Sequence, residues 1–154
     1  MKILNKFKQK GFSIIEMMVA ITISLIIGAL VANYVMQYLE ESRISQAQAK
    51  IALLTADLDS YWRFNQTFAG YNTTTVTVPN DDSIVRYNIS IYDKDTGGLL
   101  TESSSIGKHY TIIAKPSVEN KLTLYINDQG EKCSNMIANQ VTVNGCGKSG
   151  QTNW

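Results

Sequence analysis

Two hydrophobic patterns follow each other in the first part of the chain. From Phe12 to about Met36, apolar residues predominate on every side of a potential helix, over a length that can span a bilayer. Beyond Met36 the apolar positions recur at spacings of three and four, which is the period of an amphipathic helix. They are Ile44, Ala47, Ile51, Leu54, Leu58 and Tyr61. Gly28 is the only glycine of the stretch and no proline interrupts it, so the pattern predicts one continuous helix from Phe12 to about Asn65.

The amphipathic stripe indicates that the second half of this helix packs on a broad surface. A coiled-coil seam would use similar spacings, but fewer than four heptads precede the break at residues 65–72. Beyond the break, residues 85–92 alternate between apolar and polar side chains, and residues 110–115 and 122–126 also have strand character. The sequence allows a short last strand at residues 141–143. Because the connections are short, these strands predict an antiparallel meander, and the fold class is α+β: a long N-terminal α-helix packed on a small antiparallel β-sheet.

The charges near the N-terminus change this picture. Glu16 is the one charged residue in the apolar run, and the lysines before it are not accompanied by any acid. A charge at bilayer depth costs roughly 3 kcal/mol and usually marks a function or a partner. A secretory signal peptide is disfavoured, because its apolar region is shorter and Leu30 and Met18 stand where a small residue should precede a cut after Ala32 or Ala20. A plain signal anchor, with Glu16 snorkelling to the interface, remains the simpler alternative.

The segment Lys10-Gly11-Phe12, followed by an apolar helix with Glu16 at its fifth position, resembles the signature of type IV prepilins. The resemblance implies that a prepilin peptidase cuts between Gly11 and Phe12, and that the new amino group of Phe12 is N-methylated. It also implies that Glu16 of one subunit neutralises the Phe12 amine of its neighbour during filament assembly. We therefore expect four segments, namely a leader (1–11), a transmembrane and filament-core half-helix (12–36), an amphipathic half-helix (37–65) and a pilin-like sheet head (66–154).

The same resemblance implies partners and a location. The partners are other pilins in a helical filament, the prepilin peptidase and the inner-membrane pilus assembly machinery. The chain would span the bacterial inner membrane once, with its head in the periplasm, and would reach the extracellular pilus (fimbrium) after assembly. Many pilins have a proline in the part of the helix where residues 28–33 have none, and residues 110–116 and 127–130 look like minor pilins of the PilE-like group. We expect a minor pilin that serves twitching motility, cell adhesion or DNA uptake; the alternative is a pseudopilin of a type II secretion system.

Cys133 and Cys146 are the only cysteines. Outside the cytoplasm a disulfide between them is the natural interpretation, since neither a zinc ligand set nor a CxxC redox pair accompanies them. This pair also resembles the disulfide-bounded C-terminal region of pilins, which favours the pilus over the secretion system.

Charge and composition argue against other function classes. Loss of a leader with four of the 14 basic residues leaves ten basic against 13 acidic side chains, so binding of nucleic acid has no general electrostatic support. Asp93 and Asp95 suggest a calcium loop, but no glutamate stands at the spacing of an EF-hand. His109 is the only histidine and lies beside a strand pattern. We expect no enzyme, no catalytic residue, no cofactor and no metal.

Overall fold

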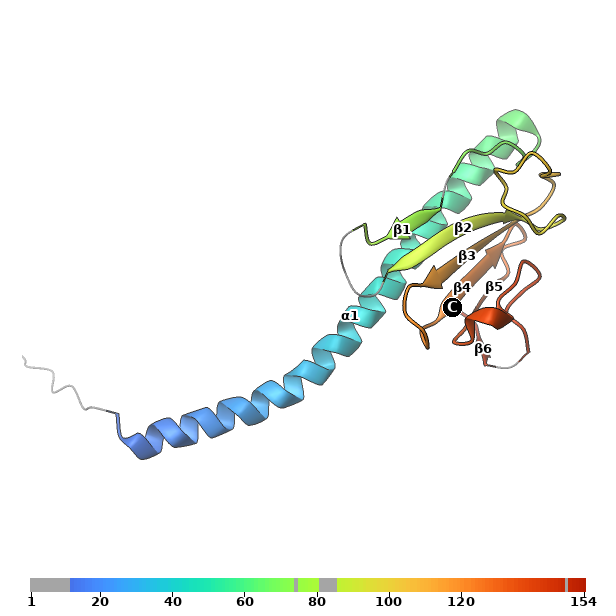
Figure 1. Ribbon diagram of the computed structural model, residues 1–154. Coiled ribbons are helices and arrows are strands. Elements are labelled where there is room, and N and C mark those ends of the chain that lie inside the picture. Colours follow the sequence, from blue (N-terminus) through green and yellow to red (C-terminus); the bar gives the residue numbers. More distant parts are fainter. Residues whose placement is uncertain (1–11, 74, 81–85, 149) are drawn as a thin grey trace, which may run out of the picture. The chain divides into compact units, whose positions relative to one another are not determined.

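The computed structural model describes residues 12–73, 75–80, 86–148 and 150–154. The chain forms two compact units that divide between Leu39 and Glu40, and each is described by itself. Helix α1 (Ile14–Asn65) runs through the division, as the sequence predicts (Figure 1). Gly11 and the predicted leader lie outside the described residues.

The first unit consists of the apolar half of α1. Its side chains are exposed throughout, and by length and composition α1 is long and apolar enough to cross a membrane. The hydroxyl groups of Thr22 and Ser24 donate to the carbonyl oxygens of Met18 (2.6 Å) and Ala20 (2.8 Å). These polar groups are therefore satisfied within the helix, as apolar surroundings require.

The second unit, residues 40–154, is called the head. In it the rest of α1 packs on a six-stranded sheet (Figure 1). The strands pair antiparallel in sequence order, which makes the sheet a meander. Their bounds are β1 (Val76–Val78), β2 (Tyr87–Asp93), β3 (Tyr110–Pro116), β4 (Thr123–Asn127), β5 (Lys132–Asn135) and β6 (Gln151–Thr152). The α+β prediction is confirmed, and the three predicted strands correspond to β2, β3 and β4.

Apolar side chains fill both faces of the sheet. On one face, strand residues such as Ile89, Ile112 and Leu124 pack against α1. From the helix, four members of the predicted stripe are buried: Ala47, Ile51, Leu54 and Leu58. Tyr61 is half-buried, and its hydroxyl donates to the carbonyl oxygen of Ala69 (3.1 Å). On the opposite face a second cluster contains Ile113, Tyr125, Cys133, Val141 and Cys146.

The short last strand predicted at residues 141–143 is wrong. The chain there follows the 3-10 helix η1 (Ala138–Gln140) and forms a tight turn, in which Thr142 N–H donates to the carbonyl oxygen of Gly145 (2.9 Å). The carbonyl oxygen of Val143 accepts from the hydroxyls of Thr111 (3.1 Å) and Tyr125 (3.3 Å). Val141, Thr142 and Val143 thus belong to a segment that covers the sheet. Its backbone is satisfied by the tight turn and by side chains instead of by a neighbouring strand.

Candidate functional site

At the start of α1, the side chain of Glu16 contacts the backbone of the residue just before the helix. Ser13 precedes the first helical residue, and its N–H donates to Oε2 of Glu16 (3.2 Å). The first helical turn closes with Met17 N–H on the carbonyl oxygen of Ser13 (3.2 Å). This is the glutamate half of a Ser-x-x-Glu capping box, and a carboxylate is favoured at a helix N-terminus by the helix dipole. Glu16 thus has a structural role within a single chain.

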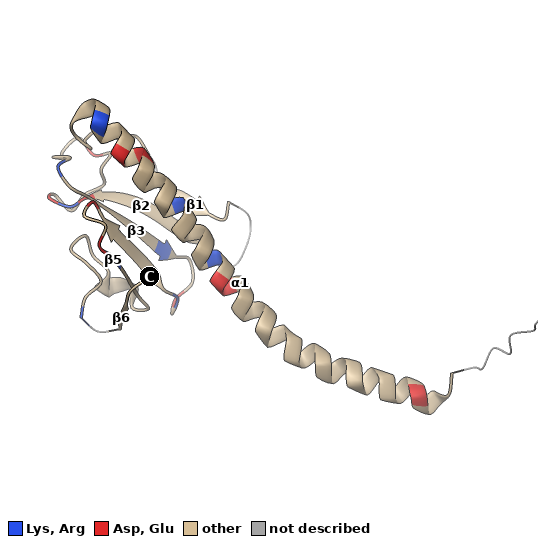
Figure 2. Cartoon of the chain, turned by 180° about the vertical axis from the view of Figure 1, so that it is seen from behind, with Lys and Arg blue, Asp and Glu red and all other residues tan. Residues whose placement is uncertain are grey.

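Phe12 lies beside this cap and is 79 % exposed. A carboxylate has two oxygens and room for about four hydrogen bonds, so the contact from Ser13 leaves Glu16 able to accept further donors. In Figure 2 the N-terminal half of α1 is uncharged apart from the acidic position near its start. The bond between Gly11 and Phe12 involves a residue outside the described part of the chain. The capping motif is visible in the sequence as Ser13-x-x-Glu16, but the analysis of charge alone missed it.

Cys133 and Cys146 are disulfide-bonded in the head. Both are buried, and they attach the covering segment, residues 136–146, to strand β5. Asn135 supports the same attachment, because its Nδ2 donates to the carbonyl oxygen of Cys146 (2.7 Å) and its Oδ1 accepts from Ile137 N–H (2.8 Å). The disulfide belongs to the second unit and the Phe12–Glu16 segment to the first, so these predicted site residues do not form one site.

Replacing both cysteines by serine is expected to cost about 3 kcal/mol of head stability, because the cross-link restricts the unfolded chain and the covering segment has few apolar residues of its own. Residues 12–39 should insert in the membrane as before. Limited proteolysis of the membrane-embedded chain should show faster cleavage within residues 134–145. Equal proteolysis rates for the double variant and the parent would contradict this expectation.

Asp93, which the sequence offers only as part of an incomplete calcium-loop pattern, is a buried carboxylate at the end of β2. Its Oδ2 accepts from the Ser105 hydroxyl (2.9 Å) and from the N–H groups of Ile106 (2.5 Å) and Gly107 (3.0 Å), while Oδ1 accepts from Asp95 N–H (2.8 Å). Burial by itself would raise the pKa of Asp93, but the hydrogen bonds outweigh it and hold the pKa below its usual value. Asp93 therefore fixes the loop of residues 94–109, which we call the distal loop.

The distal loop also contacts the chain that follows α1. Gly107 accepts from Phe68 N–H (2.8 Å) through its carbonyl oxygen. Its φ is +68°, and a Cβ there would lie 2.1 Å from the backbone nitrogen of Ala69, so only glycine fits this crossing. The distal loop thus lies at the end of the head where α1 ends.

Two further pairs of ionisable side chains lie in the described part of the head. His109 Nδ1 lies 2.7 Å from Oδ2 of Asp128, and the hydrogen bond and charge of Asp128 raise the pKa of His109. The ring is nearly half exposed, so solvent weakens the pair. Lys121, in the turn between β3 and β4, forms an ion pair with Glu40 of α1. Among the described residues, no three His, Cys, Asp or Glu side chains are placed to hold a metal ion.

Comparison with known proteins identifies the N-terminal segment. Residues 6–32 match the family model described as the prokaryotic N-terminal methylation motif, which is the signature of type IV prepilins. Neither the curated proteins nor the solved structures contain a match to the chain. The motif is shared by type IV pilins and pseudopilins, which are structural filament subunits processed by a prepilin peptidase. Together with the apolar half of α1, it fits anchoring in the inner membrane before assembly.

Proposed function

We propose that this chain is a minor type IV pilin, a structural subunit that takes part in assembling the pilus and so in motility, adhesion or DNA uptake. One observation carries the proposal: the methylation motif opens a fully exposed apolar half-helix, and the other half of the same helix packs on a small antiparallel sheet. Twenty-odd apolar residues that their own head does not cover need an environment of lipid or of neighbouring helices.

The proposed chemistry at the N-terminus follows from the positions of Gly11, Phe12 and Glu16. Cleavage after Gly11 separates residues 1–11 and leaves a cationic amine on Phe12, which is then methylated. The amine and the Glu16 carboxylate lie within one helical turn of each other in sequence, and an isolated charge in lipid is costly whereas a paired one is much less so. A subunit that enters the filament core can satisfy its neighbour's Phe12 amine with Glu16.

The proposed orientation rests on the leader. Its lysines favour a cytoplasmic N-terminus by the positive-inside bias, which leaves residues 66–154 in the periplasm before assembly. An oxidising periplasm is also the compartment in which the bonded pair Cys133 and Cys146 is expected to persist.

The minor-pilin assignment rests on the middle of α1. Residues 28–33 have no proline, and α1 is continuous through them. A pseudopilin of a type II secretion system would carry the same N-terminal motif. The covering segment held by Cys133 and Cys146 supports the pilus, because it resembles the disulfide-bounded end of pilins.

Gly11→Val is the experiment that tests processing. The branched side chain next to the bond to be cut should obstruct the peptidase, so we expect an uncleaved precursor that remains in the membrane. The matched control is Gly28→Val, since a Cβ at Gly28 would meet nothing within 4 Å. Immunoblotting of membrane fractions should show a mature-sized chain for the control and the parent. A mature-sized chain from Gly11→Val at normal abundance would remove the processing hypothesis.

A further inference from the structure

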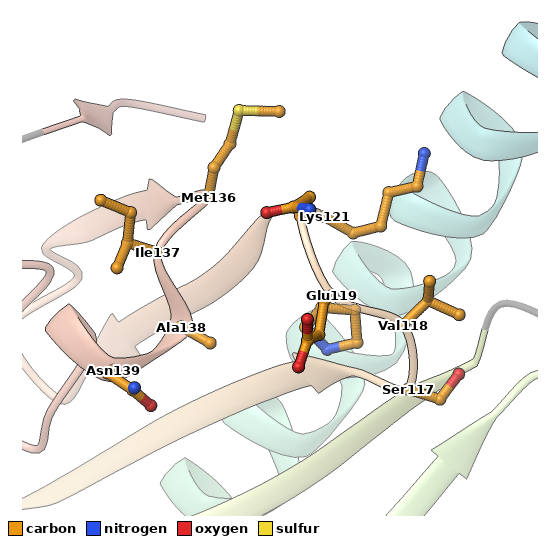
Figure 3. Close-up of a pocket in the computed structure, with 10 residues that line it drawn as sticks. Ser117, Val118, Glu119, Lys121, Met136, Ile137, Ala138 and Asn139 are labelled. Carbon is orange, nitrogen blue, oxygen red and sulfur yellow. The ribbon is translucent and has the colours of Figure 1, made fainter.

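One end of the head presents a surface that we call the head base. It consists of the turn at residues 116–121 and of residues 136–139, and these two segments line a groove of about 300 Å³ (Figure 3). The strand register explains why they meet: Thr123 at the start of β4 pairs with Asn135 at the end of β5. The chain before Thr123 and the chain after Asn135 therefore lie at the same end of the sheet.

The head base has two exposed apolar side chains among exposed polar ones, which are those of Ser117, Glu119, Asn120 and Asn139. The two apolar side chains, Met136 and Ile137, are 57 % and 49 % exposed. Figure 3 shows both side chains on one side of the groove, with Glu119 and Lys121 on the other. Lys121 is paired with Glu40, so the surface has no free lysine there to attract an anionic partner. Met136 and Ile137 are therefore the groups that this surface offers to an apolar environment.

An ion pair and a short stretch of chain connect the head base to the apolar half of α1. Tyr34 and Tyr38 are 74 % and 73 % exposed and end the apolar half of α1, which is where tyrosines of a membrane-spanning helix mark the interface. Glu40 follows Tyr38 by two residues, a distance of at most about 7 Å along an extended chain. Because the Lys121 ammonium contacts the Glu40 carboxylate, the turn of the head base is tethered within a few side-chain lengths of that interface, whatever the orientation of the head.

We propose that, before assembly, the head base rests on the lipid surface of the membrane, with Met136 and Ile137 inserted at the level of the headgroups. The inference rests on the proposed membrane anchoring. Because the head base is connected to the membrane-spanning half of α1, its effective concentration at the lipid surface is high. A small apolar contact is then enough for binding. Insertion of apolar side chains at the boundary of headgroups and acyl chains supplies the attraction. This contact would hold the subunit in a fixed orientation while it waits at the membrane.

The test uses the full-length chain in vesicles of phosphatidylethanolamine and phosphatidylglycerol that carry lipids with a nitroxide at a shallow acyl position. A fluorophore is attached at Asn139→Cys in the head base, or at Ser104→Cys in the distal loop, which is exposed at the other end of the head. We expect several-fold stronger quenching at position 139 than at position 104. Met136→Ser with Ile137→Ser should remove the difference. The matched control, Ile106→Ser, removes an equally exposed apolar side chain (51 %) from the distal loop and should leave the difference intact.

A third label, at Leu25→Cys, separates this inference from the proposed function. Strong quenching at position 25 by lipids labelled deep in the acyl region shows that α1 spans the membrane. If position 25 is quenched and position 139 is not quenched more than position 104, the chain is anchored but the head base does not touch lipid, and the inference is overturned. Quenching at position 139 that Met136→Ser with Ile137→Ser leaves unchanged would overturn it as well. If position 25 is not quenched, the membrane-anchored function itself fails.

Discussion

Glu16→Val is expected to leave the chain in the membrane and to lower its incorporation into filaments by roughly tenfold or more, because the amine of a neighbouring Phe12 then has no partner in lipid. Insertion should be unchanged or improved, since the substitution removes the one charge of the apolar run. The measurement is the ratio of the subunit in sheared surface filaments to the subunit in membranes, by quantitative immunoblotting.

The structure supplies a sharper control for this prediction. Glu16 also caps α1 through Ser13 N–H, so loss of assembly in the valine variant could come from a frayed helix end. Glu16→Gln keeps an oxygen that can accept from Ser13 but removes the charge, and Glu16→Asp keeps the charge. The charge-pair hypothesis predicts that the glutamine variant fails as the valine variant does. Filaments that contain the glutamine variant at the parent level would show that capping, and not charge, is what assembly needs.

Asp93→Asn is expected to destabilise the head by about 4 kcal/mol. The side-chain NH2 group of asparagine is a donor, and it would replace a carboxylate oxygen that now accepts hydrogen bonds from backbone N–H groups. Unfolding in detergent can be followed by the fluorescence of Trp62 and Trp154, both of which pack on the helix-side core. The control is Asp95→Asn, because Asp95 is exposed and holds Asp93 through its backbone N–H, which the substitution retains. Equal stability of the two variants would mean that Asp93 does not anchor the distal loop.

The Asp93 carboxylate also makes the stability of the head depend on pH. The pKa of Asp93 in the folded head lies below its value in the unfolded chain, so the ionised form is bound more tightly by the fold. Its stabilising contribution is complete above about pH 4 and is lost as the pH falls through the folded pKa. The parent should therefore lose stability in acid more steeply than Asp93→Asn does. Parallel pH profiles for the two proteins would contradict this assignment.

Much of the architecture could be predicted, because the spacing of apolar residues and the length of an apolar segment can be read from neighbouring residues alone. The buried positions Ala47, Ile51, Leu54 and Leu58 follow from their spacing alone, and β2 to β4 from apolar or alternating segments. Strand β5 reads Lys-Cys-Ser-Asn, and β6 is two polar residues, so neither has a hydrophobic pattern to identify it. Strand β5 forms on the edge that β4 offers, and β6 forms on the edge that β5 offers.

Among the candidate sites, too, those made of residues close in sequence could be predicted and those made of distant residues could not. Gly11, Phe12 and Glu16 are close in sequence, so the motif that relates them can be found without a structure. Asp93 and its donors at residues 105–107 are separated by a loop, and Glu40 and Lys121 are 81 residues apart in the sequence. Such pairs depend on how strands are paired and could not be predicted from periodicity.

As a minor pilin, the chain is expected to be cut after Gly11, methylated at Phe12 and assembled. Mass spectrometry of the intact subunit from sheared surface filaments tests all three points in one sample. We predict a chain that begins at Phe12, carries one methyl group on its amine and retains the disulfide between Cys133 and Cys146. A subunit in those filaments that still carries residues 1–11, or that begins at Phe12 with an unmodified amine, would contradict it.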